Sequence, residues 1–130
     1  MIFYISQFYR IKWVHETSFT DNSLSLPGVI IDCLEEDEYK IIRSLVYKNA
    51  KVFLVCYSVE DELSFFHVVN KWIPEITKHQ PRVPFILVGT KCDLPPKITS
   101  REGHELADKL EASGFIECSS KDGSGDSLLV

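Results

Sequence analysis

The sequence predicts an α/β fold with a mostly parallel sheet, and two apolar runs carry this prediction. Residues 52–57 and 84–88 are almost continuously apolar, which is typical of strands buried on both faces of a parallel sheet. Each run is followed by a segment with the signals of a helix. Strands that alternate with helices of roughly 10 to 20 residues indicate a sheet with helices on both faces.

The helix after the first run is predicted to begin at Asp61, a residue type suited to the N-cap. Pro74 lies inside the helical pattern and should kink the helix or end its first part. The apolar positions that recur at helical spacing are Leu63, Phe66, Val69, Ile73 and Ile76.

The helix after the second run has a clearer start. Thr99 and Glu102 are three residues apart and form the signature of a capping box. We expect Leu106 and Leu110 to lie on its buried face, and Gly114 to take the left-handed position that ends it. A short last strand is predicted at 115–118.

The N-terminal third is less regular. Residues 1–14 are rich in aromatic side chains but follow no clean period, and 18–25 read as a polar loop. A β-branched run at 27–32 predicts a short strand. The acidic run 35–38 then leads into an amphipathic segment. Its simplest interpretation is a favourable interaction with a helix start. The side expected to be apolar consists of Tyr39, Ile42, Leu45 and Val46.

The composition predicts one soluble domain over residues 1–130, with 45% hydrophobic and 25% charged residues. The net charge of −5, without a basic stripe, argues against nucleic acid as a partner. The four cysteines are scattered on or beside apolar stretches, so we expect reduced, structural thiols and a cytoplasmic protein.

The turn after the second strand has a chemical logic for guanine. Thr90, Lys91, Cys92 and Asp93 stand at the carboxyl end of that strand, where open α/β sheets bind ligands. The Asp93 carboxylate can accept from both N1–H and the 2-amino group of guanine, whereas adenine would leave it unpaired. The apolar stem of Lys91 can lie across the purine. A solvated surface turn is the alternative interpretation of four such residues.

Several segments between 32 and 120 carry a family resemblance. The clearest is a Lys-Trp-x-Pro-Glu-Ile helix followed by a buried strand and Gly-Thr-Lys-x-Asp-Leu. About two-thirds of the chain resembles the Rho branch of the Ras-like small GTPases. The matching residues are Asp32, Tyr39, Arg43, Tyr47, 52–59, 64–65, 71–76, His79, Pro81, 84–94 and 117–120.

This resemblance implies a guanine-nucleotide signalling switch with the fold of a P-loop small GTPase. It implies that Thr90, Lys91 and Asp93 specify guanine. It also implies that Ser119, Ser120 and Lys121 form the second loop around the base, with the backbone N–H at Ser120 meeting O6. A polar turn after a strand is the alternative for Ser119 and Ser120 taken alone. The implied partners are GTP or GDP and protein effectors or regulators.

Two departures from the family argue against catalysis. The sequence contains no Gly-x-x-x-x-Gly-Lys-Ser/Thr loop, which would cradle phosphates and supply a magnesium ligand. The family's Asp-x-x-Gly-Gln aligns with residues 32–36, where Glu35 replaces Gly and Glu36 replaces Gln. A carboxylate about 4 Å from a phosphate oxygen costs roughly 1 to 4 kcal/mol. The Glu36 carboxylate can only accept hydrogen bonds, whereas the amide of Gln both donates and accepts them.

We therefore predict no catalytic residue, no metal ligand, an Mg²⁺ site that is not intact, and weak GTP or GDP binding. The alternatives are a pseudo-GTPase interaction module, which would use the surface around 39–47, and a non-functional fragment. An unrelated flavodoxin-like domain would not explain the Lys-Trp-x-Pro-Glu-Ile helix.

The ends of the chain predict a partial fold. Ile5-Ser6 resembles the family's first helix and 13–17 its switch I, with Thr17 at the magnesium-sensing position, so the first strand and the last helix are expected to be missing. Because the first strand lies centrally in the sheet of this family, two strands would then lack the neighbour to which both hydrogen-bond. We predict a switch I-like region at 1–24, the family core at 25–120 and a polar tail at 121–130.

Two further differences concern the C-terminal half. Only 94–98 separate the Asp93 loop from the next helix, so the helical insert typical of Rho proteins is absent. The sequence carries Ser127 where a C-a-a-X box needs Cys, and no polybasic segment precedes it, so no lipid anchor is expected.

Overall fold

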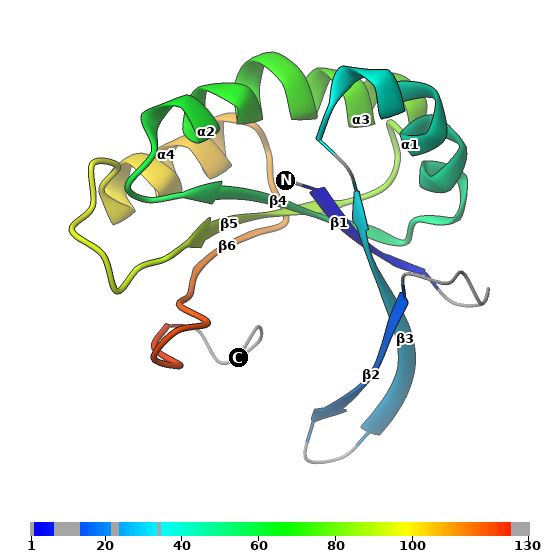
Figure 1. Cartoon of the computed structure of the whole chain (residues 1–130), viewed down its shortest axis with the longest axis horizontal. Coiled ribbons are helices and arrows are strands. Elements are labelled where there is room, and N and C mark those ends of the chain that lie inside the picture. Colours follow the sequence, from blue (N-terminus) through cyan, green and yellow to red (C-terminus); the bar gives the residue numbers. More distant parts are fainter. Residues whose placement is uncertain (1, 7–13, 22–23, 34, 126–130) are drawn as a thin grey trace.

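A computed structural model describes residues 2–6, 14–21, 24–33 and 35–125 of the chain. Six strands form one sheet, and the helices lie on one side of it (Figure 1). The elements are β1 (Ile2–Ser6), β2 (Val14–Asp21), β3 (Leu24–Cys33), α1 (Lys40–Val46), β4 (Val52–Ser58), α2 (Glu62–His67), α3 (Ile73–His79), β5 (Phe85–Thr90), α4 (Ser100–Lys109) and β6 (Gly114–Glu117). Single 3₁₀ turns flank α1 at Asp37–Tyr39 and Tyr47–Asn49, and a π-helical turn at Val68–Trp72 joins α2 to α3.

The strand order is β2-β3-β1-β4-β5-β6. β5 pairs in parallel with both β4 and β6, which confirms the predicted parallel α/β unit. The other pairings are antiparallel, so the parallel part of the sheet is confined to β4, β5 and β6 instead of extending over most of it.

The centre of the sheet differs from the prediction. β1 lies between β3 and β4 and pairs with both, so that Ile5 is opposite Ile30 on one side and Val52 on the other. The two strands expected to lack a neighbour therefore share one, and the placement of Ile5-Ser6 in a helix was wrong. A buried sheet edge favours any segment that can satisfy its backbone groups, and β-branched and aromatic residues suit that role.

The direction of β1 matters for the site. It runs antiparallel to β4, so Ile2 is opposite Val55 and Ile5 is opposite Val52. The carboxyl end of β1 therefore lies at the edge of the sheet opposite the carboxyl ends of β4 and β5. The central strand does not lead into the loops that follow β5 and β6.

Residues 18–21 and 24–25, predicted to form a polar loop, lie instead in β2 and β3, which pair with each other. β2 and β3 extend away from the body of the fold (Figure 1), with Ser18 opposite Pro27 and Thr20 opposite Ser25. Thr17, predicted at the magnesium-sensing position, lies in β2 opposite Gly28. Trp13 lies outside the described residues. Hairpin pairing satisfies the backbone even where the side chains are polar, so polarity alone did not identify a loop.

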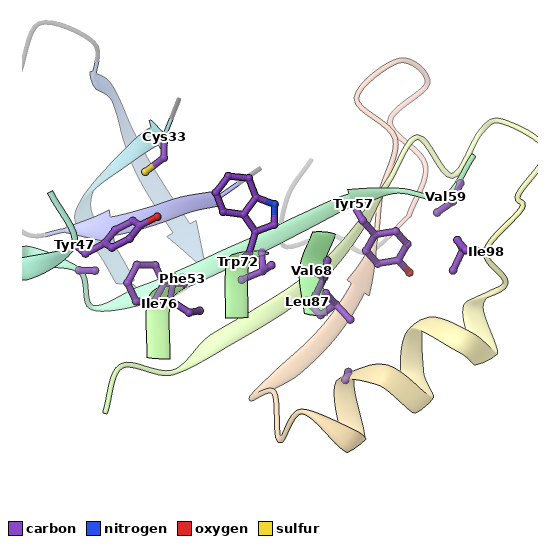
Figure 2. Packing of buried hydrophobic residues seen from close by; sticks show 13 residues of the cluster. Cys33, Tyr47, Phe53, Tyr57, Val59, Val68, Trp72, Ile76, Leu87 and Ile98 are labelled. Carbon is purple, nitrogen blue, oxygen red and sulfur yellow. The ribbon is translucent and has the colours of Figure 1, made fainter. Parts of the chain in front are cut away.

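Helices α1 to α4 all lie on one face of the sheet (Figure 1), which differs from the predicted cover on both faces. Successive side chains of β4 alternate between two apolar clusters, one on each face of the sheet. Phe53, Val55 and Tyr57 point toward the helices, where Trp72 packs over the strand (Figure 2). Leu54 and Cys56 belong to a smaller cluster with Val88 on the other face. This alternation is the two-residue period of a strand buried on both sides.

Asp61 caps α2 as predicted, because its side chain accepts from the backbone N–H of Leu63 at 3.0 Å. The predicted buried face of the segment 62–79 is confirmed at Ile73 and Ile76, which pack in the core, but it was wrong in the first part of the segment. Leu63, Phe66 and Val69 are exposed, and the buried residues are Val68, Trp72, Glu75 and Ile76. A π-helical turn at Val68–Trp72 lies between α2 and α3, and its i→i+5 hydrogen bonds break the regular helical period on which the prediction relied.

The capping box of α4 is present, with Thr99 and Glu102 each accepting from the other's backbone N–H. Leu106 and Leu110 are half-buried and pack against the core as expected. The left-handed residue after the helix is Glu111, with a φ of 57°, and Gly114 instead begins β6. No helix in the described part of the chain is long and apolar enough to cross a membrane.

The apolar side predicted for α1 is confirmed only in part: Val46 packs against the core, but two of the four predicted residues do not. Ile42 and Leu45 are both 56% exposed, and Ile41 is 76% exposed. The residues that α1 and the following turn bury are Arg43 and Tyr47. A polar network, described below, determines which side of α1 faces the fold.

Candidate nucleotide-base site

The two loops predicted to surround a base lie side by side at the carboxyl edge of the parallel unit. One loop follows β5 and the other follows β6, and the two strands are neighbours. The backbone joins them twice: Cys118 N–H donates to Gly89 O at 2.9 Å, and Cys92 N–H donates to Cys118 O at 3.2 Å. The parallel pairing thus extends into the loops and fixes their relative position.

One buried hydroxyl joins three of the predicted residues. Ser119 is 1% exposed, and its Oγ donates to Asp93 Oδ1 at 2.6 Å. The backbone N–H of Lys121 donates to the same Oγ at 3.2 Å. An ionised carboxylate has about four acceptor sites, so Asp93 keeps capacity for a ligand beyond this hydrogen bond. The hydroxyl holds the carboxylate in one orientation.

The other predicted residues have different surroundings. Thr90 donates its hydroxyl to Tyr57 O at 2.9 Å, which ties the start of the loop to β4. Lys91 adopts a φ of 58°, and its ammonium is 3.5 Å from Glu60 Oε1 at an exposed position. Ser120 and Lys121 have exposed side chains. Asp93, Ser119 and the Lys121 backbone are therefore brought together, while the side chains of Thr90 and Lys91 are directed to β4 and to Glu60.

Hydrogen bonds among residues 119–125 fold the segment after β6 into a turn. Asp122 accepts from both the N–H and the hydroxyl of Ser124, and these hydrogen bonds hold the pKa of Asp122 below its usual range. Ser119 N–H donates to Ser124 O, and Gly123 N–H donates to Ser119 O. Gly125 bridges back to Cys118. The Asp-Gly-Ser-Gly sequence is a turn signal that could have predicted this reversal.

Gly125 has a structural reason to be glycine. Its φ is +107°, and a Cβ there would fall against the carbonyl oxygen of Glu117. Few residues other than glycine reach this part of conformational space without strain. The turn therefore depends on Gly125 to bring the segment 119–125 back against β6.

A second polar cluster, which the sequence did not reveal, fixes the segment that precedes α1. Arg43 makes a bidentate pair with Glu75, with Nε to Oε1 at 2.8 Å and Nη2 to Oε2 at 3.0 Å. Tyr47 donates its hydroxyl to the same Oε1 at 2.8 Å. Arg43 Nη1 donates to Glu36 O at 2.7 Å, so Glu36 is tied to α3 through the guanidinium. The Arg43 side chain is 2% exposed and that of Glu75 is 6% exposed.

Opposing effects set the pKa of Glu75. Burial acts to raise this pKa, but the hydrogen bonds from Arg43 and Tyr47 outweigh burial and hold it below the ordinary value. Burial, followed by the hydrogen bond to Glu75, raises the pKa of Tyr47, so the phenol stays protonated and donates. Glu75 therefore accepts three hydrogen bonds at neutral pH, two from Arg43 and one from Tyr47.

The lowered pKa of Glu75 predicts how the stability of the fold changes with pH. A carboxylate whose pKa is lower in the folded state stabilises the fold above its unfolded pKa, and that contribution is lost as the pH falls through the folded pKa. As the pH falls below about 5, we expect the free energy of unfolding to decrease more steeply in the wild-type chain than in Glu75→Gln. Urea unfolding of both chains at a series of pH values measures the two slopes. Equal slopes in the two chains would contradict a lowered pKa of Glu75 in the folded state.

The fold and these loops define a class of protein. The chain is an α/β domain with adjacent Thr-Lys-x-Asp and Ser-Ser-Lys turns at the carboxyl ends of parallel strands, an arrangement that resembles the base-binding side of a small GTPase.

Comparisons with known proteins place the chain within that class. Residues 13–126 match the sequence profile of the Ras family. The chain is also 36% identical over 118 residues to the Rho-related protein racC of Entamoeba histolytica, and the match covers 80% of this chain. The chain therefore belongs to the Ras family of small GTPases and is Rho-like, as the sequence predicted. It spans 61% of the length of that relative.

Proposed function

We propose that this Rho-like chain binds guanine nucleotides weakly, through the base, and does not hydrolyse GTP. The observation that carries the proposal is the 2.6 Å hydrogen bond from Ser119 to Asp93, which joins the two loops that would surround a base. Asp93 accepts from N1–H and the 2-amino group, while Lys91 lies over the purine and the Ser120 N–H meets O6. Pre-orientation of Asp93 lowers the entropy cost of this contact.

The phosphate side supports weak binding without hydrolysis. The described residues provide no glycine-rich loop beside Asp93, since the central strand β1 runs toward the opposite edge. Glu35 and Glu36 are exposed carboxylates at the positions that the family uses for Gly and Gln. Like charges repel a phosphate, and an acceptor-only side chain cannot donate to it. Base contacts are then the main source of affinity.

A nucleotide titration tests this proposal directly. The chain is titrated with fluorescent analogues of GDP and ADP, each with and without Mg²⁺. We expect weak binding that prefers the guanine analogue and changes little with Mg²⁺. Tight, magnesium-dependent GDP binding, or equal affinity for the two bases, would contradict the proposal.

Replacing Asp93 with asparagine should change which base is preferred. The asparagine amide would present a donor as well as an acceptor, so it leaves the guanine 2-amino group without a partner but suits the oxygen that xanthine carries at that position. We expect GDP affinity to fall about tenfold to a hundredfold while affinity for the xanthine analogue rises. Competition titrations with GDP and XDP measure this change.

Asp108→Asn is the matched control for that substitution. Asp108 is exposed on α4, and the same change of charge there should leave both affinities unaltered. The amide oxygen of the Asp93→Asn variant can still accept the hydrogen bond from Ser119, so this variant should keep its stability. A loss of GDP binding without any gain for XDP would show that Asp93 acts through the fold and not through the base.

A second candidate function is a non-catalytic interaction module in the cytoplasm. The exposed α1 residues Ile41, Ile42 and Leu45 support it, because the network around Arg43 and Glu75 holds α1 in place by contacts within the chain. Such a surface would be presented to a protein partner whether or not a nucleotide is bound.

A further inference from the structure

A cavity of about 240 Å³ lies between the start of α1 and the helical segment that contains α3. It does not overlap with the loops around Asp93. Its charged lining is predominantly basic, although the chain carries a net charge of −5. The ionisable residues of the lining are Lys40, Lys71, Lys78, His79, Asp37 and Glu75.

The two carboxylates in this lining are already engaged. Glu75 accepts hydrogen bonds from Nε and Nη2 of Arg43 and from the hydroxyl of Tyr47. Asp37 Oδ1 is 3.4 Å from Lys71 Nζ, and the pair lies at the surface. Each negative charge in the cavity therefore has a cation beside it.

Lys71 is held by several contacts. Its ammonium donates to Glu35 O at 2.6 Å and lies 4.6 Å from the centre of the Trp72 ring, in a cation–π arrangement. The charge of Lys71 is thus already engaged by contacts within the chain.

Lys40 and Lys78 remain as cations that form no close ion pair within the part of the chain that the structure describes, and only Lys40 acts through its charge on a carboxylate of the lining, that of Glu75. Lys40 begins α1, and Lys78 lies in the last turn of α3, so they come from the two opposite walls of the cavity. Two like charges that face one cavity repel each other, and an anion placed between them removes this repulsion. The geometry favours a ligand with negative charge.

We propose that this cavity binds acidic side chains from an extended segment of a protein partner. The volume is smaller than that of most small-molecule pockets, and it suits a pair of carboxylate side chains. The exposed apolar residues Ile41, Ile42 and Leu45 lie on the same short helix as Lys40 and would pack against the apolar residues of that segment. This combination favours a peptide over a free inorganic anion. The inference rests on the interaction-module function and does not require nucleotide binding.

The test uses the whole chain and a fluorescein-labelled peptide of the sequence Glu-Leu-Glu-Glu-Leu-Glu. A second peptide with Gln in place of every Glu has the same length and apolar content. The double variant Lys40→Gln with Lys78→Gln removes the two unpaired cations, and Lys48→Gln with Lys109→Gln removes two exposed cations elsewhere. Fluorescence anisotropy measures affinity at low and at physiological salt, and thermal unfolding confirms that each variant is folded.

We expect the wild-type chain to bind the Glu peptide and not the Gln peptide. The Lys40 and Lys78 double variant should bind the Glu peptide at least about tenfold more weakly, with less than about a twofold change in the control double variant. Asp93→Asn should bind the peptide as the wild type does, and this separates the inference from nucleotide binding.

Three outcomes would overturn the proposal. Equal loss in the two double variants would indicate non-specific attraction to positive charge. If the Glu peptide does not bind at either salt concentration, the cavity does not bind an acidic segment. Displacement of the peptide by an equal concentration of inorganic phosphate would assign the cavity to small anions.

Discussion

Glu75→Gln is expected to lower the free energy of unfolding by about 3 to 5 kcal/mol, because it leaves the buried Arg43 guanidinium without its counter-ion. Arg43 is 2% exposed, so water cannot replace the lost carboxylate. Tyr47, which is fully buried, also loses a charged acceptor for its hydroxyl. Urea unfolding at pH 7, followed by circular dichroism, measures the change.

Glu105→Gln is the matched control for this substitution. Glu105 pairs with Arg101 at the same distance of 2.8 Å, but that pair is exposed on α4. Exposed pairs of this kind contribute at most about 1 kcal/mol. If the two substitutions cost the same, burial does not determine the importance of the Arg43 pair.

Removing both charges tests whether the cost comes from the unpaired cation. A buried ion pair replaced by apolar side chains of similar volume is often neutral. We therefore expect Arg43→Met combined with Glu75→Leu to be more stable than Glu75→Gln alone. If the double variant is the less stable one, the pair itself supplies stability beyond what apolar packing offers.

This network explains why Ile42 and Leu45 of α1 were wrongly predicted to be buried. Arg43 and Glu75 are 32 positions apart, and no local pattern shows that a guanidinium will be buried against a distant carboxylate. Hydrophobic periodicity therefore assigned Ile42 and Leu45 to the core, whereas the ion pair turns them toward solvent. Side-chain pairing over long sequence distances takes precedence over the local apolar pattern.

The parallel unit and the two loops were predictable because their signals are local. The apolar run before Gly89 identified a strand buried on both faces, and Asp93 followed it at the sheet edge that parallel strands share. The Thr99 capping box fixed the start of α4. The direction of β1 was not predictable in this way, because an apolar strand can pair in either orientation and only the complete sheet decides.

The hydrogen bond between Ser119 and Asp93 was predictable only in part, unlike the two loops, which were predictable, and the direction of β1, which was not. The two residues were expected to lie near one base, but not to contact each other directly. Their contact follows from the register of β5 and β6, in which Gly89 is opposite Glu117. A pairing register cannot be derived from motifs alone, since a shift of one residue would turn each side chain to the other face of the sheet.

Gly103→Ala is expected to destabilise the fold by about 1 to 3 kcal/mol, although alanine is the better helix former. Gly103 lies within α4 and is buried against β4 and β6. A Cβ there would lie 2.5 Å from the hydroxyl oxygen of Tyr57, and it would press against Cζ of Phe115. Both rings would have to move. Overpacking therefore outweighs the gain in helix propensity, which is about 1 kcal/mol.

The Tyr57 hydroxyl offers a way to separate the two contacts. It is buried and finds no hydrogen-bond partner among the described residues, so Tyr57→Phe removes an unsatisfied polar atom and should cost little or stabilise the fold. Gly103→Ala should then cost less in the Tyr57→Phe background than in the wild type, because one of the two clashes is gone. Chemical unfolding of the four chains gives the coupling energy. Asp108→Ala, an exposed position in the same helix, reports the effect of alanine without a clash. If the cost of Gly103→Ala is unchanged by Tyr57→Phe, the contact with Phe115 alone determines the requirement for glycine.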